Sequence, residues 1–230
     1  VRDDSMKGKV ALVTGASSGI GKATAEAFVR RGANVMLADV EETEGKALAR
    51  SLDASGQHVQ FVCCDVSDEG QVRHMVAETL RRFGRLDYAF NNAGIEGLQA
   101  SLADSTQANW DRVLAVNLRG IELCMKHEIH AMLEQGGGAI VNTASIAGLV
   151  GFPGLSAYVA SKHGIVGLTR AAALECAANA IRINAVCPGP IETPMLDRIV
   201  AADPAMAVHL TAQVPMGRIG RPEEVAEAVV

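Results

Sequence analysis

A tyrosine and a lysine one helical turn apart are the residues of this sequence best suited to acid–base chemistry. Tyr158 and Lys162 lie in the run 154–168 with three residues between them, so a helix would place both side chains on one face. A free tyrosine loses its proton near pH ~10 and is a poor base at neutral pH, but a neighbouring ammonium group lowers the pKa of a phenol. We therefore predict that Tyr158 gives or takes a proton and that Lys162 lowers its pKa.

Ser145 is the third residue that this chemistry could use. It follows an apolar run, 139–144, which predicts a buried strand of a parallel sheet. Its hydroxyl would then lie at the carboxyl end of that strand, where open α/β sheets bind ligands. Taken alone, a tyrosine and a lysine at this spacing more often lie on a solvated helix face. The catalytic hypothesis therefore depends on the rest of the chain.

Near the N-terminus, a strand, a glycine-rich turn and a helix follow one another. The apolar run 10–14 ends at Gly15, and Gly19 and Gly21 follow before a helical period begins. Such a turn points backbone N–H groups and the positive end of a helix at one place, which suits a pyrophosphate. The spacing is G-x-x-x-G-x-G rather than G-x-G-x-x-G, and a glycine turn alone is weak evidence. Between a strand and a helix it predicts a dinucleotide site.

Asp39 ends the second apolar run, 34–38, and indicates which dinucleotide is bound. A carboxylate at this distance from the glycine turn accepts hydrogen bonds from an adenosine ribose and would repel a 2′-phosphate. Neither Ser18 nor Val40 is an arginine that could bind such a phosphate. We expect NAD as the cofactor rather than NADP. The alternative is that Asp39 is an ordinary turn residue at the end of a strand.

The rest of the chain repeats strand and helix, which predicts right-handed crossovers and a doubly wound parallel sheet. The expected strands are 59–64, 86–90, 139–144 and 181–187; the expected helical regions are 41–55, 68–83 with Asp68 as its cap, 107–133 and 154–168. We therefore predict an α/β protein with one Rossmann-type domain over residues 7–230, preceded by a tail over 1–6. Residues 191–220 contain no clean strand and are expected to form a substrate loop or lid.

Composition excludes several classes of function. The 230 residues suit one α/β domain, and 21 basic against 26 acidic residues give a net charge of −5 without a basic cluster. Nucleic acid is therefore not an expected partner. Without an apolar run of about 20 residues or a secretion signal, we expect no membrane partner and a cytoplasmic location. The five cysteines show no C-x-x-C, so neither a disulfide framework nor a metal site is expected.

Several motifs occur in a fixed order between residues 7 and 230. They are Thr14-Gly15-x-x-x-Gly19-x-Gly21, Asn91-Asn92-Ala93-Gly94, Asn117, Ser145, Tyr158-x-x-x-Lys162 and Pro188-Gly189. Each is weak alone, but the ordered set resembles the classical short-chain dehydrogenase/reductase family. The resemblance implies a single Rossmann domain shared by substrate and cofactor, and a homotetramer or homodimer. Members of that family continue with a last edge strand and tail, which we expect to exist but to be missing from this sequence.

The resemblance also implies a role for each matching position. Tyr158 would be the general acid/base, Ser145 would hydrogen-bond the substrate oxygen, Lys162 would hold the nicotinamide ribose, and Asn117 would anchor a proton-relay water. The expected cofactor contacts are Gly15, Ser17, Ser18, Gly19, Ile20, Gly21, Asp39, Val40, Asp65, Val66, Asn91, Ala93, Gly94, Tyr158, Lys162, Pro188, Gly189, Ile191 and Thr193. Of these, Asn91 and Gly94 would lie beside the adenosine ribose, Asp65 and Val66 at the adenine, and Ile191 and Thr193 at the nicotinamide amide. The expected substrate contacts are Ser145, Ala147, Phe152, Tyr158 and Met195.

The function expected from these residues is an NAD-dependent oxidoreductase that interconverts a small secondary alcohol and its ketone. One alternative is an NADPH-dependent 3-oxoacyl-carrier-protein reductase, which needs a 2′-phosphate acceptor and a basic dock for the acidic carrier. Asp39 opposes the first requirement, and the helical residues His130, Glu134 and Asn179 supply no arginine for the second. Another alternative is a non-catalytic dinucleotide sensor. A sensor would need only the glycine turn and Asp39, so the presence of Ser145, Tyr158 and Lys162 argues against it.

Overall fold

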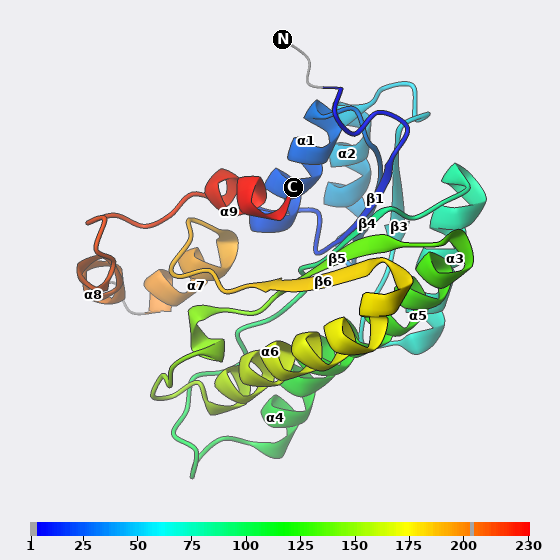
Figure 1. Ribbon diagram of the computed structural model, residues 1–230. Coiled ribbons are helices and arrows are strands. Elements are labelled where there is room, and N and C mark those ends of the chain that lie inside the picture. Colours follow the sequence, from blue (N-terminus) through cyan, green and yellow to red (C-terminus); the bar gives the residue numbers. More distant parts are fainter. Residues whose placement is uncertain (1–3, 203–204) are drawn as a thin grey trace.

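Six parallel strands form the centre of the molecule, with helices on both faces of the sheet (Figure 1). The computed structural model describes residues 4–202 and 205–230. The strands are β1 (Val10–Thr14), β2 (Asn34–Asp39), β3 (Val59–Cys63), β4 (Tyr88–Asn91), β5 (Gly138–Thr143) and β6 (Ile181–Val186). Their order in the sheet is β3-β2-β1-β4-β5-β6, and every neighbouring pair is parallel. This arrangement is the doubly wound Rossmann fold, so the predicted fold class is confirmed.

Side chains alternate along the central strands and fill both faces of the sheet. The helices are α1 (Gly19–Arg30) and α2 (Glu42–Leu52) on one face, and α3 (Glu69–Phe83), α5 (Gly120–Gln135) and α6 (Ser156–Cys176) on the other. Leu12 of β1 packs against the second group of helices, whereas Ala11 and Val13 pack against the first. A strand covered on both faces is buried at every position, which is why β1 is apolar from Val10 to Val13.

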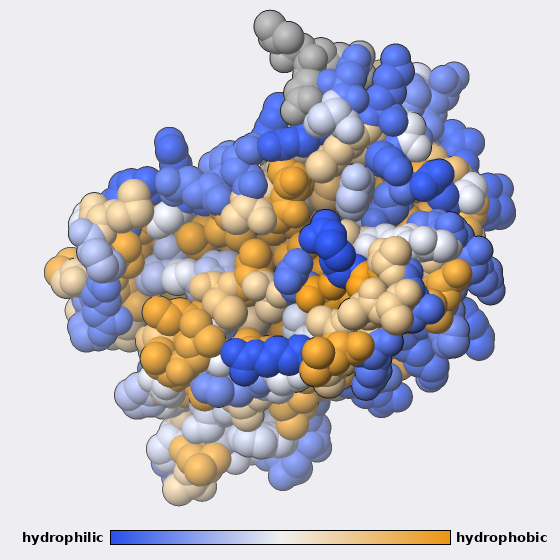
Figure 2. Space-filling model, in the orientation of Figure 1, coloured by the Kyte–Doolittle hydropathy of each residue, from blue (hydrophilic) through white to orange (hydrophobic). Residues whose placement is uncertain are grey.

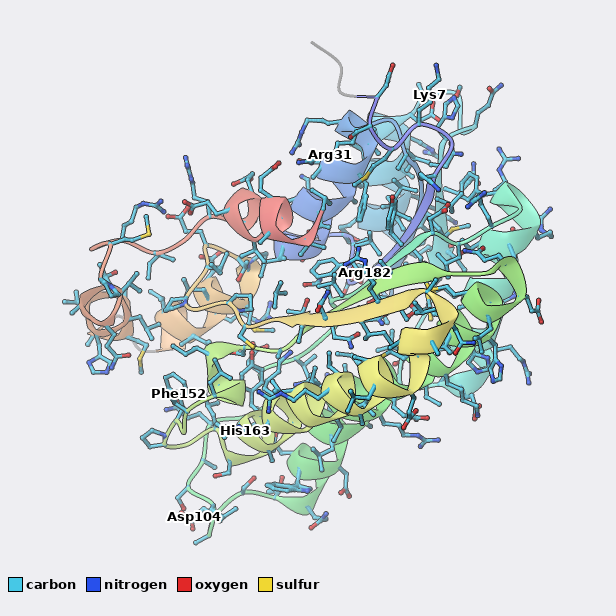
Figure 3. The ribbon with its side chains drawn as sticks, viewed as in Figure 1. Lys7, Arg31, Asp104, Phe152, His163 and Arg182 are labelled. Atoms are coloured by element: carbon cyan, nitrogen blue, oxygen red, sulfur yellow. The ribbon has the colours of Figure 1, made fainter. Side chains whose placement is uncertain are left out.

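The last helix, α9 (Pro222–Val229), lies along α1. Ala226 packs against Ala23 and Ala27, and these small side chains allow the two helices to approach closely. Arg31, labelled in Figure 3, donates from Nη2 to Glu227 Oε2 at 2.6 Å. The backbone N–H of Met6, which the sequence placed in the tail, donates to the Arg31 carbonyl at 2.9 Å, while residues 1–3 lie outside the described residues.

The region predicted to be helical at 107–133 is helical but not regular. The helix α4 (Gln107–Leu114) leads into a π-helical segment, η1 (Ala115–Arg119), and α5 follows without a break. Asn117 lies in this π segment and is fully buried. Single π turns inside helices occur frequently at functional sites. The apolar pattern could not show this one, because the residues on either side keep an ordinary helical period.

Residues 191–220 contain two helices, so the prediction of an irregular loop is wrong. These helices are α7 (Pro194–Ala202) and α8 (Ala205–Gln213); residues 203 and 204 between them lie outside the described residues. An isolated bridge between Ile191 and Gly220 joins the two ends of the segment. Helix α8 was missed because none of its described side chains is fully buried, so no strong apolar stripe marks it.

A buried polar network ties β4 and β5 to α5 in the core. Asn91 donates from Nδ2 to Glu128 Oε2 at 2.9 Å and to Asn142 Oδ1 at 3.0 Å. Glu128 Oε1 and Asn91 Oδ1 are buried and accept no hydrogen bond from the described residues. Burial raises the pKa of Glu128 from 4.5 to about 7, and the hydrogen bond from Asn91 only partly opposes this shift. Glu128 is therefore favoured in its neutral form inside the fold.

Replacing Glu128 by glutamine is expected to stabilise the protein above neutral pH. Because the folded state raises the pKa, it holds a proton that the unfolded chain releases between about pH 4.5 and about pH 7. The free energy of unfolding of the wild type therefore falls as the pH rises through this range, by up to about 3 kcal/mol in total. The Glu128→Gln variant, which carries a neutral amide, does not lose this stability. Urea unfolding should give a larger gain for Glu128→Gln at about pH 8 than at about pH 5. Glu134→Gln, on the exposed side of the same helix, is the control, and an equal gain at both pH values would contradict the prediction.

Candidate active site

The residues predicted to be catalytic converge beyond the carboxyl ends of β4 and β5. In Figure 1 these strand ends point towards α7 and α8, on the left of the view. Gly94, just after β4, lies so close to the other residues that a Cβ atom on it would be 3.3 Å from Asn117 Oδ1 and 3.7 Å from Lys162 Nζ. The lack of a side chain at Gly94 therefore keeps space open between these two residues.

Tyr158, Lys162 and Ser145 form one contiguous group. Lys162 Nζ lies 5.5 Å from the centroid of the Tyr158 ring, as expected from their shared helix face on α6. Lys162 is buried, and its Nζ donates to the Thr143 carbonyl at 2.8 Å. Ser145 caps the short 3-10 helix η2 (Ile146–Gly148), where its Oγ accepts from the Ala147 N–H at 3.1 Å, and its side chain is near enough to Tyr158 to lower the pKa of the phenol. The predicted trio is therefore assembled at one place.

The pKa of Tyr158 is shifted in the direction opposite to our prediction. Burial raises the pKa of Tyr158, its hydrogen bond with Ser145 lowers it, and the negative charge of Glu96 raises it further. Burial also lowers the pKa of Lys162 to about 8. The net shift in the chain by itself is therefore upward, and the effect of the Lys162 charge on the Tyr158 pKa stays a prediction. Burial weakens the lysine's own charge, and its Nζ hydrogen bond goes to Thr143 instead of the phenol.

Asn117 uses its side chain to hold the backbone that follows β4. Its Oδ1 accepts from the Ile95 N–H at 2.8 Å, and its Nδ2 donates to the Ile95 carbonyl at 2.9 Å and to Ser161 Oγ at 3.2 Å. These bonds fix the segment that carries Gly94. Both amide hydrogens of Asn117 are thus used, and its Oδ1 has one acceptor position left.

The glycine turn has the features of an anion site. Gly15 and Gly19 adopt left-handed backbone angles, with φ of 61° and 51°. A Cβ on Gly15 would lie 2.9 Å from Ala93 Cα, and one on Gly19 would lie 3.0 Å from Thr193 Cγ2. The glycine turn therefore lies close to the main chain after β4 and to the side chain of Thr193.

Two observations indicate that a dinucleotide fits this turn. The hydroxyl of Ser17 is buried and has no hydrogen-bond partner among the described residues. Helix α1 begins at Gly19, and within the described chain Ser18 forms no side-chain cap, so N–H groups of its first turn remain available to an anion. Ile20 and Gly21 belong to this first turn. A pyrophosphate would satisfy both the hydroxyl and the helix end.

Asp39 lies beside the turn, as its position in the sequence predicted. Its Oδ2 accepts from the Ser17 N–H at 2.9 Å and its Oδ1 from the Glu41 N–H at 3.1 Å. A carboxylate has about four acceptor positions, so two remain for a ribose. Val40 next to it is exposed, and the Cys64 N–H donates to the Asp39 carbonyl at 3.0 Å. That contact brings the next residue, Asp65, to the same edge of the sheet.

Three of the predicted cofactor residues use all or part of their side chains in contacts within the fold. Val66 is buried beneath Gly120, and the Asn91 side chain belongs to the core network with Glu128. Asp65 accepts from both the N–H and the hydroxyl of Ser67, so its Oδ1 closes a local turn. Val66 and Asn91 would contact an adenosine through backbone atoms, whereas Asp65 keeps its Oδ2 for a ligand. Pro188 accepts from the Ile146 N–H at 2.9 Å, which places Pro188 and Gly189 beside the Ser145 segment.

The structure places the predicted substrate contacts Ala147, Phe152 and Met195 in three different environments. Ala147 is buried, so its side chain does not face open space, and this prediction is wrong. Phe152 lines an open depression of about 540 Å³ together with Val159 and His163, and none of the catalytic trio lines it. Figure 3 shows Phe152 and His163 at the same end of α6. The depression lies on a different side of α6 from Tyr158, so Phe152 is better placed at the rim than against a reacting group. Met195 is half-buried on α7.

The sequence did not reveal two kinds of supporting residue. Thr14 Oγ1 accepts from the N–H groups of Asn92 and Ala93 at 2.9 and 3.2 Å, which joins the glycine turn to the segment after β4. Its place directly before Gly15 was a signal for this role. Glu96 and Arg198 form an ion pair across 102 positions of sequence, with Arg198 Nε 2.7 Å from Glu96 Oε1. No local pattern could have shown that pair.

The fold and this group of residues define a dinucleotide-binding protein with acid–base side chains at the same sheet edge. A family model described as enoyl-(acyl carrier protein) reductase matches residues 15–230. A 2,5-dichloro-2,5-cyclohexadiene-1,4-diol dehydrogenase of Sphingobium indicum is 44% identical over 226 residues, which cover 98% of this chain and 89% of the relative. A cyclohexanol dehydrogenase of an Acinetobacter strain is 42% identical over 229 residues, covering 100% of this chain and 89% of the relative.

The crystal structure of a levodione reductase superposes on this fold with a TM-score of 0.91 and 41% sequence identity, covering 97% of this chain and 90% of that one. The chain belongs to the short-chain dehydrogenase/reductase family. It is an oxidoreductase that acts on CH–OH groups with a nicotinamide dinucleotide and interconverts a secondary alcohol and its ketone.

Proposed function

We propose that this protein is an NAD-dependent dehydrogenase of cyclic secondary alcohols, with Tyr158 as its general acid/base. One observation carries the proposal: Tyr158 has Lys162 Nζ 5.5 Å from its ring centroid, and the Ser145 side chain lowers the pKa of its phenol, at the sheet edge that also holds the glycine turn. The unpartnered Ser17 hydroxyl supports a dinucleotide in that turn. The site thus has both the proton acceptor and the cofactor cradle that alcohol oxidation needs.

Tyr158, Ser145 and Lys162 each have a separate role in the proposed alcohol oxidation. NAD, when bound, accepts the hydride that leaves the carbinol carbon. Tyr158 takes the hydroxyl proton, and Ser145 donates a hydrogen bond to the same oxygen as the carbonyl forms. Lys162, with a pKa of about 8, is mostly protonated at neutral pH, so its positive charge stabilises the phenolate that Tyr158 becomes when it acts as a base. Ketone reduction is the same sequence in reverse.

The preference for NAD rests on Asp39. Its carboxylate lies at the end of β2 beside the glycine turn, with two acceptor positions left for ribose hydroxyls. A 2′-phosphate at that place would face this negative charge, and the exposed Val40 offers it no cation. In this proposal Gly15, Gly19, Ile20 and Gly21 hold the pyrophosphate. The main chains of Asp65, Ala93, Gly189 and Ile191 complete the nucleotide site.

The proposed substrate class follows from the walls of the site and from the relatives. Ile146, Leu149 and Val150 follow Ser145 and keep 39%, 57% and 47% of their surface exposed. Figure 2 shows hydrophobic surface where this segment lies. Two relatives are named for cyclic alcohols, and apolar walls suit such rings. We further propose that α7 and α8, with Met195, form the lid over this substrate.

The proposal is tested by measuring the affinity of the protein for each cofactor and then turnover on a panel of cyclic and linear secondary alcohols. We expect tighter binding of NADH than of NADPH and a higher kcat/KM for the cyclic alcohols. Tighter binding of NADPH would refute the cofactor assignment. Binding of NADH without turnover on any alcohol or ketone would favour the non-catalytic sensor.

A second candidate is reduction of an acyl chain carried by acyl carrier protein, because the matching family model is described as such a reductase. That function requires a basic surface for an acidic carrier. His130 and Glu134 on α5, and Asn179 in η3 (Ala177–Asn179), are exposed but include no arginine. We expect little turnover of a 3-oxoacyl thioester with NADPH, and efficient turnover would make this candidate the better one.

We also propose a homotetramer or a homodimer. An open groove of about 850 Å³ between α4 and α6, lined by Leu114, Leu118 and Leu168, could bind a second copy of the chain. Sedimentation velocity would test this assembly.

In residues 4–202 and 205–230, no helix combines the length and hydropathy that a membrane span requires. With the acidic composition, we propose a cytoplasmic location, which imaging of a tagged protein would test.

A further inference from the structure

A buried hydroxyl lies between Tyr158 and Lys162 on α6 and has no part in the proposed chemistry. It belongs to Ser161, whose side chain is fully buried. Its Oγ donates to the Tyr158 carbonyl at 2.7 Å and accepts from Asn117 Nδ2 at 3.2 Å. The Ser161 hydroxyl therefore joins the helical turn that carries Tyr158 to the π segment η1.

Asn117 extends this contact to the segment that follows β4. Its Oδ1 accepts from the Ile95 N–H at 2.8 Å, and its Nδ2 donates to the Ile95 carbonyl at 2.9 Å. Asn117 is itself fully buried, so no water competes for these bonds from the surface. One chain of hydrogen bonds therefore runs from the segment after β4, through Asn117 and Ser161, to the carbonyl of Tyr158.

Close packing holds the same turn of α6 on two sides. A Cβ atom on Gly164 would lie 2.9 Å from Cδ1 of Leu118, which belongs to η1. A Cβ atom on Gly148 of η2 would lie 2.7 Å from the Lys162 carbonyl. Ser161 and Gly164 are three residues apart and share one face of the helix. This face therefore offers η1 both a hydroxyl and a gap that the Leu118 side chain fills.

Thr169, two turns further along α6, is a hydroxyl of the same kind in a different place. It is also buried, and its Oγ1 accepts from Nδ2 of the buried Asn142 on β5 at 3.0 Å. Asn142 in turn accepts from Asn91 in the core network. The two hydroxyls thus make similar bonds to asparagine amides, but only the bonds of Ser161 lead to Tyr158.

We propose that Ser161 is a positioning residue for alcohol oxidation: its two hydrogen bonds fix the turn of Tyr158 and Lys162 relative to the π segment. The inference rests on the proposed dehydrogenase function, in which Tyr158 takes the substrate proton. Ser161 acts through its neighbours, because its side chain is buried and both bonds stay inside the fold. A misplacement of about 1 Å costs about a hundredfold in rate, so loss of the hydroxyl should lower kcat more than it changes binding.

The test compares Ser161→Ala with Thr169→Val, which removes the control hydroxyl. Each variant leaves a buried asparagine N–H without its acceptor, so both should lower the midpoint of urea unfolding. Ser161→Ala should also lower kcat for a cyclic alcohol by roughly tenfold to a hundredfold, with KM and the affinity for NADH within about threefold of the wild type. Thr169→Val should keep the wild-type kcat. A fall in kcat of the same size in both variants, or in neither, would overturn the inference.

A double-mutant cycle shows whether Ser161 acts through Asn117. Asn117→Ala breaks the same chain of hydrogen bonds at the next link, so adding Ser161→Ala to it should lower kcat little further. Two losses that simply multiply would contradict the positioning role. Ser161→Cys is the second variant if Ser161→Ala does not fold, since the thiol is similar in size but a weak acceptor. Its kcat should also fall, and a full wild-type kcat would count against the role.

Hydrogen exchange provides a measurement that needs no turnover. The Ile95 N–H is held by Asn117, which Ser161 holds in turn, so it should exchange faster in Ser161→Ala than in the wild type or in Thr169→Val. A wild type that oxidises no alcohol would refute the proposed function, and this exchange would then decide the inference. Faster exchange only in Ser161→Ala would support the coupling of Ser161 to Asn117, whereas unchanged exchange would overturn it.

Discussion

Tyr158→Phe is expected to lose nearly all turnover while it keeps the affinity for NAD. The substitution removes only the hydroxyl, which is the group that takes the substrate proton, and general acid–base catalysis contributes about 10²- to 10⁴-fold. The phenylalanine ring can still pack where the tyrosine ring lies, beneath Lys162 Nζ at 5.5 Å. We therefore expect a fall of that size in kcat, measured by NADH formation, with little change in the dissociation constant of NADH.

The other tyrosine provides a matched control for this experiment. Tyr88 lies on β4 and stacks on Phe28, with ring centroids 5.8 Å apart, in the core cluster of α1 and α2. Tyr88→Phe removes the same hydroxyl from a ring with no part in the site, so its kcat should stay close to that of the wild type. A Tyr158→Phe variant as active as Tyr88→Phe would refute the role given to Tyr158.

Combining Asp39→Ala with Val40→Arg is expected to reverse the cofactor preference from NAD to NADP. The first change removes the carboxylate that would repel a 2′-phosphate, and the second places a guanidinium at an exposed position beside it. Each effect corresponds to at least about 1.4 kcal/mol, or a factor of about ten, so the ratio of the two kcat/KM values should change roughly a hundredfold or more. Steady-state kinetics with both cofactors measure this ratio.

Asp39→Asn separates the charge of Asp39 from its structural contacts. The amide oxygen can still accept from the Ser17 N–H, which Asp39 does now at 2.9 Å, but it carries no negative charge. We expect this control to weaken the discrimination against NADP without creating a preference for it. If the wild type and both variants show the same ratio of NAD to NADP activity, Asp39 does not select the cofactor.

The order of strands and helices was predictable because each element is specified locally. A buried strand such as β1 is apolar over nearly its whole length, and Gly15 and Gly19 mark a turn whose left-handed angles suit glycine. Asp68 was expected to cap a helix, and its side chain accepts from the Gln71 N–H. The grouping of Ser145, Tyr158 and Lys162 followed from the same local rules, since strand ends and helix faces fix where side chains point.

What the sequence did not reveal depends on contacts between distant segments. The π segment around Asn117 and the ion pair of Glu96 with Arg198 exist only once the helices pack against the sheet. The pKa of Tyr158 was predicted in the wrong direction for the same reason. Spacing shows that Lys162 is near, but not that burial of both groups outweighs their attraction. Helix α8 was missed because none of its described side chains is fully buried and its apolar residues do not form a clear stripe.

Following a deuterium label tests the central claim most directly. The protein is incubated with NAD and a cyclic secondary alcohol that carries deuterium on its carbinol carbon, and the reduced cofactor is analysed by mass spectrometry. Because the carbinol hydrogen leaves as a hydride while Tyr158 takes only the hydroxyl proton, we predict that the label appears in the nicotinamide ring of NADH and none in water. Deuterium released into water, or left on an unreacted alcohol, would contradict the account.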